Sequence, residues 1–345
     1  MVTIIIPTYK RSKYIERAIY SILRQTYKDY EIIVVDDNDP ETEDRKRLEE
    51  IMKKYENDSR IKYVKHDKNR NGAVARNTGI KIAKGEYITF LDDDDYFLKN
   101  RLEVLVAALE ENKEYSGVFS SSLVKKEKLF TKVKIASEFK DYIKETLNQI
   151  SIIGTGSNMF FRAQALKDIN GFNEEFFRHQ DFELLIRFLE NGNKMLGVDE
   201  ILVVKDNSSR INEPGVEKAL EYREKYLKYF EHTIKKYEDY EEIYIKNYKE
   251  LLLNAVRNKN EELIKIIYER IKTYVVDEKK INEINELIKK EEEKCKVKKN
   301  ILRKMKWRYK YNRSRKATSD KIKASIAKEK IDEIFEIEKI KSIKV

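Results

Sequence analysis

The fold is decided by residues 2–38, which read VTIIIPTYKRSKYIERAIYSILRQTYKDYEIIVVDDN. Two Ile/Val-rich runs, at 2–6 and 31–35, are typical of strands buried in a parallel sheet. Between them, apolar residues recur every three or four positions over 15–23, which predicts an amphipathic helix with Ser12 as its N-cap. Strand, helix and strand in this order predict a βαβ unit.

The alternation of strands and helices continues to about residue 212. Further strands are expected at 61–64, 86–91 and 196–204, and further helices at 73–84, 101–111 and 181–190. Gly85 is expected to end the helix at 73–84, because glycine commonly follows a helix C-terminus. The pattern between 118 and 161 is weaker and mixes both periods. We therefore predict an α/β fold with a Rossmann-like, mostly parallel sheet flanked by helices.

The composition changes after residue 212, where long Glu-, Lys-, Tyr-, Ile- and Leu-rich stretches with helical spacing replace the short strands. We predict three parts, namely an α/β domain at 1–212, a helical domain at 213–295 and a basic amphipathic segment at 296–345. The helical domain is expected to serve oligomerisation or contact with an acceptor, and a homo-oligomer is left open.

The net charge of +10 is concentrated near the C-terminus. Residues 296–330 hold fifteen Lys or Arg against Asp320 and Glu329, interleaved with apolar and aromatic residues that include Trp307. Such a segment suits an anionic membrane surface or a partner protein, although it also suits a solvated helix without a partner. No nucleic-acid partner is expected.

Several classes of protein are excluded by simple counts. Cys295 is the single cysteine, so no intrachain disulfide framework can form, and a reducing compartment fits. The N-terminus enters a predicted strand at once instead of a signal peptide, and no apolar run reaches the length of a membrane span. We expect a cytoplasmic protein, peripheral at the inner face of the cell membrane.

Polar residues follow three of the predicted strands where each strand ends. Pro7, Thr8, Tyr9 and Arg11 follow the first strand, Asp37 follows the second, and the four aspartates at 92–95 follow the strand at 86–91. The carboxyl ends of parallel strands meet at one edge of a sheet, so these segments are expected to line one ligand site. Four adjacent carboxylates repel one another, which a hard divalent cation relieves. An acidic turn that caps the next helix is the alternative.

The segment at 69–77, NRNGAVARN, is rich in small residues. These residues let a helix N-terminus approach a ligand closely, and the amides together with Arg76 suit a phosphate or a base. Small residues also serve tight packing of a helix on a sheet, so this segment alone leaves both readings open.

Seven motifs in order resemble those of the family 2 glycosyltransferases, which are inverting enzymes with the GT-A fold. The resemblance covers about residues 1–210. The motifs are PTYKR at 7–11, VVDD at 34–37, NGAVARN at 71–77, FLDDDD at 90–95, GSNMFFR at 156–162, GF at 171–172 and HQDFELLIR at 179–187.

The resemblance implies roles for named residues. A divalent ion, Mn²⁺ or Mg²⁺, would be bound by Asp92 and Asp94, with Asp206 as a further candidate. Asp181 would be the general base, as the carboxylate of the Gln180-Asp181 pair where the family often has Glu-Asp. The nucleotide would contact Pro7, Thr8, Tyr9, Arg11, Asp37, Asn71, Arg76, Asp92 and Asp93. The donor or acceptor sugar would contact Gly156, Ser157, His179 and Gln180.

The function predicted is transfer of a hexosyl or N-acetylhexosaminyl group from a nucleotide-sugar, a UDP-sugar by preference, to a hydroxyl group. The acceptor would be a cell-surface glycan or a lipid-linked intermediate of polysaccharide biosynthesis at the cell envelope. A sugar nucleotidyltransferase is the alternative enzyme, although residues 7–12 lack the glycine-rich phosphate loop that it would need. A non-catalytic protein that binds nucleotide-sugars, or a scaffold, is the alternative outside enzymes.

Overall fold

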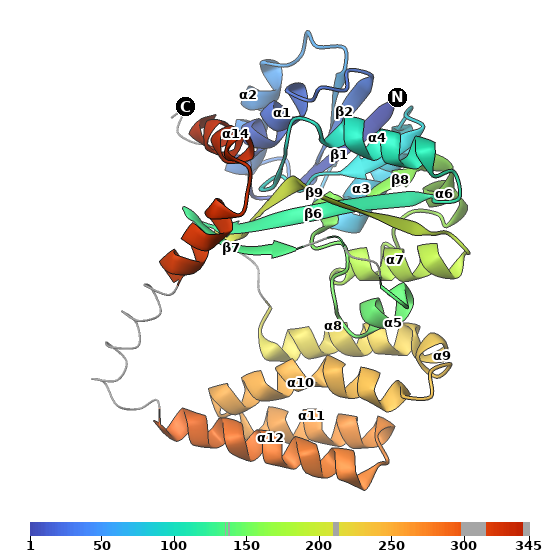
Figure 1. Ribbon diagram of the computed structural model, residues 1–345, viewed down its shortest axis with the longest axis vertical. Coiled ribbons are helices and arrows are strands. Elements are labelled where there is room, and N and C mark those ends of the chain that lie inside the picture. The colour runs from blue at the N-terminus through green and yellow to red at the C-terminus, as the bar shows by residue number, and fades with distance from the viewer. Residues whose placement is uncertain (135, 137–138, 210–213, 298–314, 341–345) are drawn as a thin grey trace. The chain divides into compact units, whose positions relative to one another are not determined.

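The computed structural model describes residues 1–134, 136, 139–209, 214–297 and 315–340 (Figure 1). The chain forms two compact units, which we call the sheet unit and the helical unit. The sheet unit comprises residues 1–143, 151–209 and 316–345, and the helical unit comprises 144–150 and 210–315.

The units divide the C-terminal region differently from the sequence prediction. The boundary expected at residue 212 lies outside the described residues, as does 298–314, the part of the basic segment that contains Trp307. The remainder of that segment does not stand alone, because residues from 316 onward belong to the sheet unit.

Nine strands form one sheet in the described residues. Their order is β3-β2-β1-β4-β8-β6-β9-β5, and β7 pairs with β6. The neighbours β3, β2, β1 and β4 are parallel, β8 is antiparallel to both β4 and β6, and β6 is parallel to β9. The strands are β1 (Val2–Thr8), β2 (Tyr30–Asp36), β3 (Ile61–Lys65), β4 (Tyr87–Phe90), β5 (Tyr96–Phe97), β6 (Gly117–Lys126), β7 (Leu129–Lys134), β8 (Phe160–Arg162) and β9 (Met195–Asp206).

Helices cover both faces of this sheet, which confirms the predicted α/β class. One core cluster joins β1 and β2 to α1 (Ile15–Leu23), α2 (Glu43–Lys53) and α4 (Arg101–Glu111). The cluster on the opposite face involves α3 (Gly72–Ile82), α6 (Ala163–Asp168) and α7 (Gln180–Glu190).

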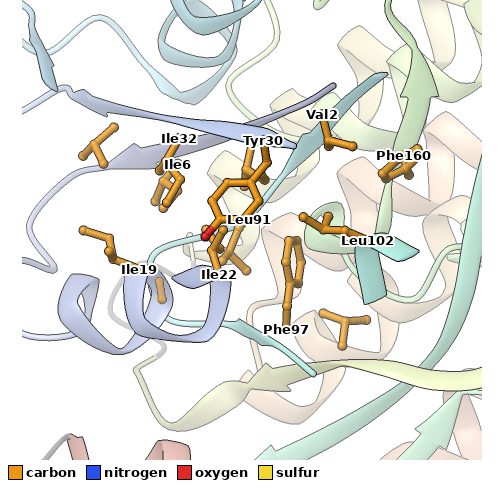
Figure 2. Close-up of a cluster of buried hydrophobic side chains, with 14 of the residues drawn as sticks. Val2, Ile6, Ile19, Ile22, Tyr30, Ile32, Leu91, Phe97, Leu102 and Phe160 are labelled. Carbon is orange, nitrogen blue, oxygen red and sulfur yellow. The ribbon is translucent and has the colours of Figure 1, made fainter. Parts of the chain in front are cut away.

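Strand β1 shows how the apolar pattern builds both clusters. Ile4 and Ile6 belong to the first cluster and Ile5 to the second, because successive side chains of a strand point to opposite faces. Figure 2 shows Ile6 near Ile19 and Ile22 of α1 in the first cluster. An unbroken apolar run is therefore what a strand covered on both faces requires.

Two expected helix ends were wrong. Helix α1 begins at Ile15 with Tyr14 at its N-cap, because the hydroxyl of Ser12 donates instead to Asp44 Oδ1 at 2.6 Å. Helix α3 ends at Ile82, three residues before Gly85. Glycine is needed at 85 for a different reason, since a Cβ there would lie 2.6 Å from the backbone nitrogen of Thr3.

The helical unit contains the predicted run of helices. Its members are α8 (Val216–Tyr229), α9 (Glu231–Ile234), α10 (Tyr240–Asn258), α11 (Glu261–Tyr274) and α12 (Glu278–Val297). Tyr244 of α10 stacks on Tyr274 of α11 with ring centroids 4.0 Å apart. Asn247 of α10 donates at 2.8 Å to the carbonyl of Leu147, the last residue of α5 (Tyr142–Leu147). None of the helices in the described part of the chain combines the length and apolarity that crossing a bilayer demands.

A C-terminal helix, α14 (Lys328–Lys339), packs on the sheet unit (Figure 1). Ile334 and Ile337 of this helix join a third buried cluster with Tyr96 of β5 and Val204 of β9. The amphipathic spacing of 331–337 thus has an apolar partner within the sheet unit.

Candidate active site

The three segments that follow β1, β2 and β4 meet at one edge of the sheet. Thr8 and Asp36 are register partners at the ends of β1 and β2, and the amide of Asp37 donates to the carbonyl of Thr8 at 2.9 Å. Arg11 Nη1 lies 2.7 Å from Asp94 Oδ2, which joins the first segment to the aspartates. Parallel strands therefore bring together residues that lie more than eighty positions apart, as predicted.

The four aspartates differ in their exposure and partners. Asp92 is the most open, with its side chain 30% exposed, and Oδ1 lies 2.6 Å from Arg76 Nη2. Asp94 is 12% exposed and paired with Arg11, whereas Asp93 is 4% exposed and 3.5 Å from the same guanidinium. The two aspartates chosen as metal ligands are thus the more accessible pair.

Asp95 points into the protein and holds the loop. Its Oδ2 accepts hydrogen bonds from the hydroxyls of Thr155 at 3.0 Å and Ser157 at 2.6 Å, and its Oδ1 accepts from the amide of Asp206. The hydroxyl of Ser157 also accepts from the amide of Asp92. The fully buried Ser157 therefore positions the aspartates, and its predicted contact with a sugar stays a prediction.

The carboxyl groups of this loop differ in the direction of their pKa shifts. Burial and the neighbouring Asp94 raise the pKa of Asp93 well above its usual range, and burial with Asp94 and Asp92 raises the pKa of Asp95 to about 7. Burial also acts to raise the pKa of Asp92, but Arg76 and more distant cations lower it overall. Burial is the larger cause of both raised pKa values, and repulsion by the neighbouring carboxylates adds to it.

A complete metal cage is absent from the residues that the structure describes, where no three His, Cys, Asp or Glu side chains converge suitably. Mg²⁺ commonly takes one or two carboxylates from the protein and the rest of its ligands from phosphates and water. Asp92 and Asp94 would supply two such carboxylates, and their binding of a metal ion stays a prediction.

Arg76 connects Asp92 to Gln180, the residue that precedes the predicted base. One guanidinium nitrogen binds Asp92, and the other donates to Gln180 Oε1 at 3.0 Å, at the start of α7. Gly72 permits this arrangement, because a Cβ at that position would lie 2.9 Å from Arg76 Nη1. Gln180 thus has a defined role in holding Arg76 in place. Gly156 is also close, since a Cβ there would lie 3.8 Å from Asp92 Oδ2.

Asp181 lies in the first turn of α7 and is partly exposed. Burial raises the pKa of Asp181 above its ordinary value, although Lys205, the amide of Phe182 and Arg76 act to lower it. His179 precedes the helix in a left-handed conformation (φ 59°), and its ring stacks on Phe182. A partly buried carboxylate of raised pKa is a better proton acceptor than an ordinary aspartate.

Asp37 and Asn71 are more deeply engaged in the fold than the sequence suggested. The 2%-exposed Asp37 accepts from His66, from the side chain of Asn69 and from the amides of Arg70 and Asn71. Asn71 caps α3 through its Oδ1 and donates to the carbonyl of Glu174. Both residues therefore shape the loop at 69–71, and their direct contact with a nucleotide stays a prediction. Among the other predicted contacts, Pro7 and Tyr9 are partly exposed and Thr8 is buried.

Asp206, the third metal candidate, lies in a buried ion-pair network. Its side chain is 1% exposed, with Oδ2 at 2.8 Å from Arg17 Nη1 and 3.3 Å from Lys125 Nζ, while Oδ1 accepts from the amide of Ser208. Arg17 also donates to the carbonyl of Asp94. The carboxylate of Asp206 is therefore already paired with two cations, which argues against metal ligation. Through Arg17 and its own amide, Asp206 instead supports the aspartate loop.

Arg101 is a supporting residue that the sequence analysis missed. It is fully buried at the start of α4, where burial lowers its pKa to about 9. Its guanidinium donates to Ser120 Oγ, to Asn158 Oδ1 and to the carbonyl of Ser157, and it lies over the ring of Phe97. No pattern in the sequence distinguishes it from a solvent-exposed arginine in a helix, because its partners come from distant segments.

Comparison with known proteins shows the family of this chain. The family model "Glycosyl transferase family 2" matches residues 3–170. An uncharacterized glycosyltransferase of Methanocaldococcus jannaschii is 32% identical over 212 residues, which cover 59% of this chain and 69% of that protein. The GalNAc(5)-diNAcBac-PP-undecaprenol β-1,3-glucosyltransferase of Campylobacter jejuni is 35% identical over 185 residues, 52% of this chain and 56% of that protein.

A solved structure has the same fold. The crystal structure of Staphylococcus aureus TarS 1–349 in complex with UDP-GlcNAc superimposes with a TM-score of 0.52 at 22% identity, covering 65% of this chain and 63% of that one. This likeness confirms the predicted GT-A fold of the sheet unit. The family model and the Methanocaldococcus jannaschii relative show that the chain belongs to glycosyltransferase family 2.

Proposed function

We propose that this protein transfers a sugar from a UDP-sugar to a hydroxyl group of a lipid-linked or other glycan acceptor. The observation that carries the proposal is the link from Asp92 of the aspartate loop through Arg76 to Gln180, the residue that directly precedes Asp181. Support comes from a relative whose name gives an undecaprenol-linked acceptor and from a similar fold solved with UDP-GlcNAc. Family membership favours this activity over a sugar nucleotidyltransferase or a non-catalytic scaffold.

The donor diphosphate is proposed to lie against Asp92 and Asp94. Mn²⁺ or Mg²⁺ bound by these two carboxylates would neutralise the charge that develops on the leaving diphosphate. Arg11 and Arg76 hold the two carboxylates in place. Tyr9, partly exposed directly after β1, would stack on the base of the nucleotide.

Asp181 is proposed to accept the proton of the acceptor hydroxyl as that oxygen attacks the anomeric carbon. The C–O bond to the diphosphate breaks as the new glycosidic bond forms on the opposite face, which inverts the configuration. Gln180 fixes the start of α7 through its hydrogen bond to Arg76, so the base and the leaving-group site are held by one connection. Precise placement of a base contributes typically 10²–10⁴-fold to rate.

We expect turnover to fall as the pH is lowered towards the raised pKa of Asp181. A base must be deprotonated, and burial raises the pKa of Asp181, so the acid limb of kcat should lie above the ordinary aspartate value of 3.8. The measurement is kcat against pH in the presence of saturating MnCl₂. A rate that stays constant down to the ordinary aspartate range would contradict this assignment.

The proposed activity is tested by incubating the purified protein with a panel of UDP-sugars and MnCl₂ and by measuring the release of UDP. We expect release from one donor or a small subset, and acceleration by glycan or undecaprenol-linked acceptors. Equal inactivity with every UDP-sugar, while the protein remains folded, would overturn the choice of donor nucleotide.

The location of the protein is part of the proposal as well. A lipid-linked acceptor would place the enzyme at the cytoplasmic face of the cell membrane, where the basic residues of 296–330 would attract anionic lipids or a partner protein. Association of helical units into a homo-oligomer is the other interaction proposed for the C-terminal half.

A further inference from the structure

Helix α14 contacts the rest of the sheet unit through charged groups as well as through its apolar face. Glu333 accepts the backbone amide of Lys99 at 2.6 Å, and Lys330 binds Glu200 at 2.7 Å. Ile334 and Ile337 are buried in the same interface. These contacts fix the position of the last turn of the helix, which carries Glu338.

Glu338 binds two groups that lie beside the aspartate loop. Its Oε1 forms an ion pair with Lys125 of β6 and accepts the hydroxyl of Tyr96 at 3.0 Å. Tyr96 directly follows Asp95, and it is completely buried. The C-terminal helix thus contacts the residue next to the proposed diphosphate site.

A chain of ion pairs continues from Glu338 to the loop itself. Lys125 also binds Asp206 at 3.3 Å, and Asp206 binds Arg17 at 2.8 Å. Arg17 then donates to the carbonyl of Asp94, while the amide of Asp206 donates to Asp95. The route from the C-terminal helix to the aspartate loop is therefore continuous and made of charged hydrogen bonds.

The charges of this network are balanced. Arg17 and Lys125 supply two cations, and Asp206 and Glu338 supply two carboxylates. The side chains of Arg17, Lys125 and Asp206 are at most 3% exposed. Removing one member of a buried ion-pair network leaves an opposite charge uncompensated, which forces its partners to rearrange. Without the charge of Glu338, Asp206 would be the one carboxylate of this four-residue network left to balance two cations. Lys125 would then compete with Arg17 for the carboxylate of Asp206.

We propose that Glu338 is a positioning residue of the donor site and that helix α14 therefore contributes to UDP binding. Its carboxylate holds Lys125 in place, so that Lys125 and Arg17 both bind Asp206. Arg17 in turn holds the carbonyl group of Asp94, beside the proposed position of the UDP diphosphate. The proposal rests on the proposed function, because it takes the aspartate loop to be the UDP site. Glu338 lies 168 residues (338 − 170) beyond the end of the region that the family model matches.

The test compares full-length Glu338→Gln with a matched control, Glu333→Gln, by calorimetric titration of UDP in MnCl₂. Both variants remove one carboxylate from α14, but Glu333 contacts the amide of Lys99 and not the ion-pair chain. We expect UDP to bind Glu338→Gln about tenfold more weakly, the lower end for residues that support a ligand-binding group. Glu333→Gln should bind UDP as the wild type does.

A second variant separates a charge effect from simple loosening of the helix. Lys125→Met combined with Glu338→Gln restores charge balance and leaves the Arg17–Asp206 pair intact, so it should recover most of the lost UDP affinity. Recovery supports the proposal, whereas a double variant no better than Glu338→Gln overturns it. Equal weakening in Glu333→Gln and Glu338→Gln also overturns it, because docking of the helix would then explain the result.

The same experiment distinguishes failure of the wider proposal. If the wild-type protein does not bind UDP in MnCl₂, the assignment of the donor site is wrong. If the wild type binds UDP and Glu338→Gln binds it equally well, the donor site stands and the role of Glu338 is wrong.

Discussion

Replacing Asp181 with asparagine is expected to lower kcat by about 10²–10⁴-fold, the usual contribution of a general base. Asparagine keeps the size of the side chain and its place in the first turn of α7 but cannot accept the proton of the acceptor hydroxyl. UDP binding in MnCl₂ should remain unchanged, because Arg76 connects to α7 through Gln180 and not through Asp181. The fall of kcat at low pH that protonation of Asp181 causes should be absent from the variant.

The measurement is steady-state UDP release with the best donor of the panel, paired with UDP titration of the same variant. Glu190→Gln, at the far end of α7, is the control for the effect of altering this helix. A large loss of UDP affinity in Asp181→Asn would assign the residue to donor binding. Near-wild-type turnover would place the base elsewhere.

Replacing Asp94 with asparagine is expected to lower turnover by roughly 100-fold or more at a fixed low concentration of MnCl₂, at the upper end of losses seen even for residues that only support a metal ligand. Asparagine retains an oxygen that can accept from Arg11 but removes the negative charge that would attract the ion. High MnCl₂ should restore part of the rate, since the remaining ligand Asp92 keeps its place.

The fold should tolerate this change. Asp94 is one of the charges that raise the pKa values of Asp93 and Asp95, so its neutralisation lowers both and relieves repulsion at pH 8. The melting temperature at pH 8 should therefore not fall markedly, and Asp168→Ala on the exposed end of α6 is the control for substitution of an aspartate. Loss of activity accompanied by unfolding would contradict this separation of function from stability.

The sheet could be predicted from the sequence because its strands are buried on both faces. The runs in β1, β2 and β4 are mostly apolar, so their type and approximate ends follow from the pattern alone. The sequence predicts strand β6 only weakly, because Ser120, Ser121 and Ser122 interrupt its apolar pattern. The structure satisfies these buried hydroxyls at 120 and 121 through Asn158 and Asp199, partners that no local pattern reveals.

Helix α2 was missed for a similar reason. Leu48, Ile51 and Met52 are its buried apolar residues, and most of the rest of the helix is charged. Arg45 contributes to its buried face through an ion pair with Asp36 at 2.8 Å, so one inward position carries a charge that the apolar pattern does not count. A helix that buries a paired arginine does not show the apolar stripe on which the prediction depends.

The convergence of the predicted segments could be derived from the sequence, but the partners of individual side chains could not. Strand-end logic correctly brought Arg11 and Asp94 together, because parallel strands fix which loops meet. Asp206 is a candidate metal ligand only through the family resemblance, and its partners Arg17 and Lys125 lie 189 and 81 residues away. Pairings at such separations follow from packing in three dimensions and leave no local signal.

The central claim is that the aspartate loop binds a nucleoside diphosphate together with a divalent ion. Calorimetric titration of UDP into the wild-type protein, first with MnCl₂ and then after EDTA, tests it most directly, with Asp94→Asn in MnCl₂ as the third arm. We predict binding with MnCl₂, affinity at least tenfold weaker in EDTA, and an Asp94→Asn curve that resembles the EDTA curve. UDP affinity that is the same in all three titrations would contradict the claim.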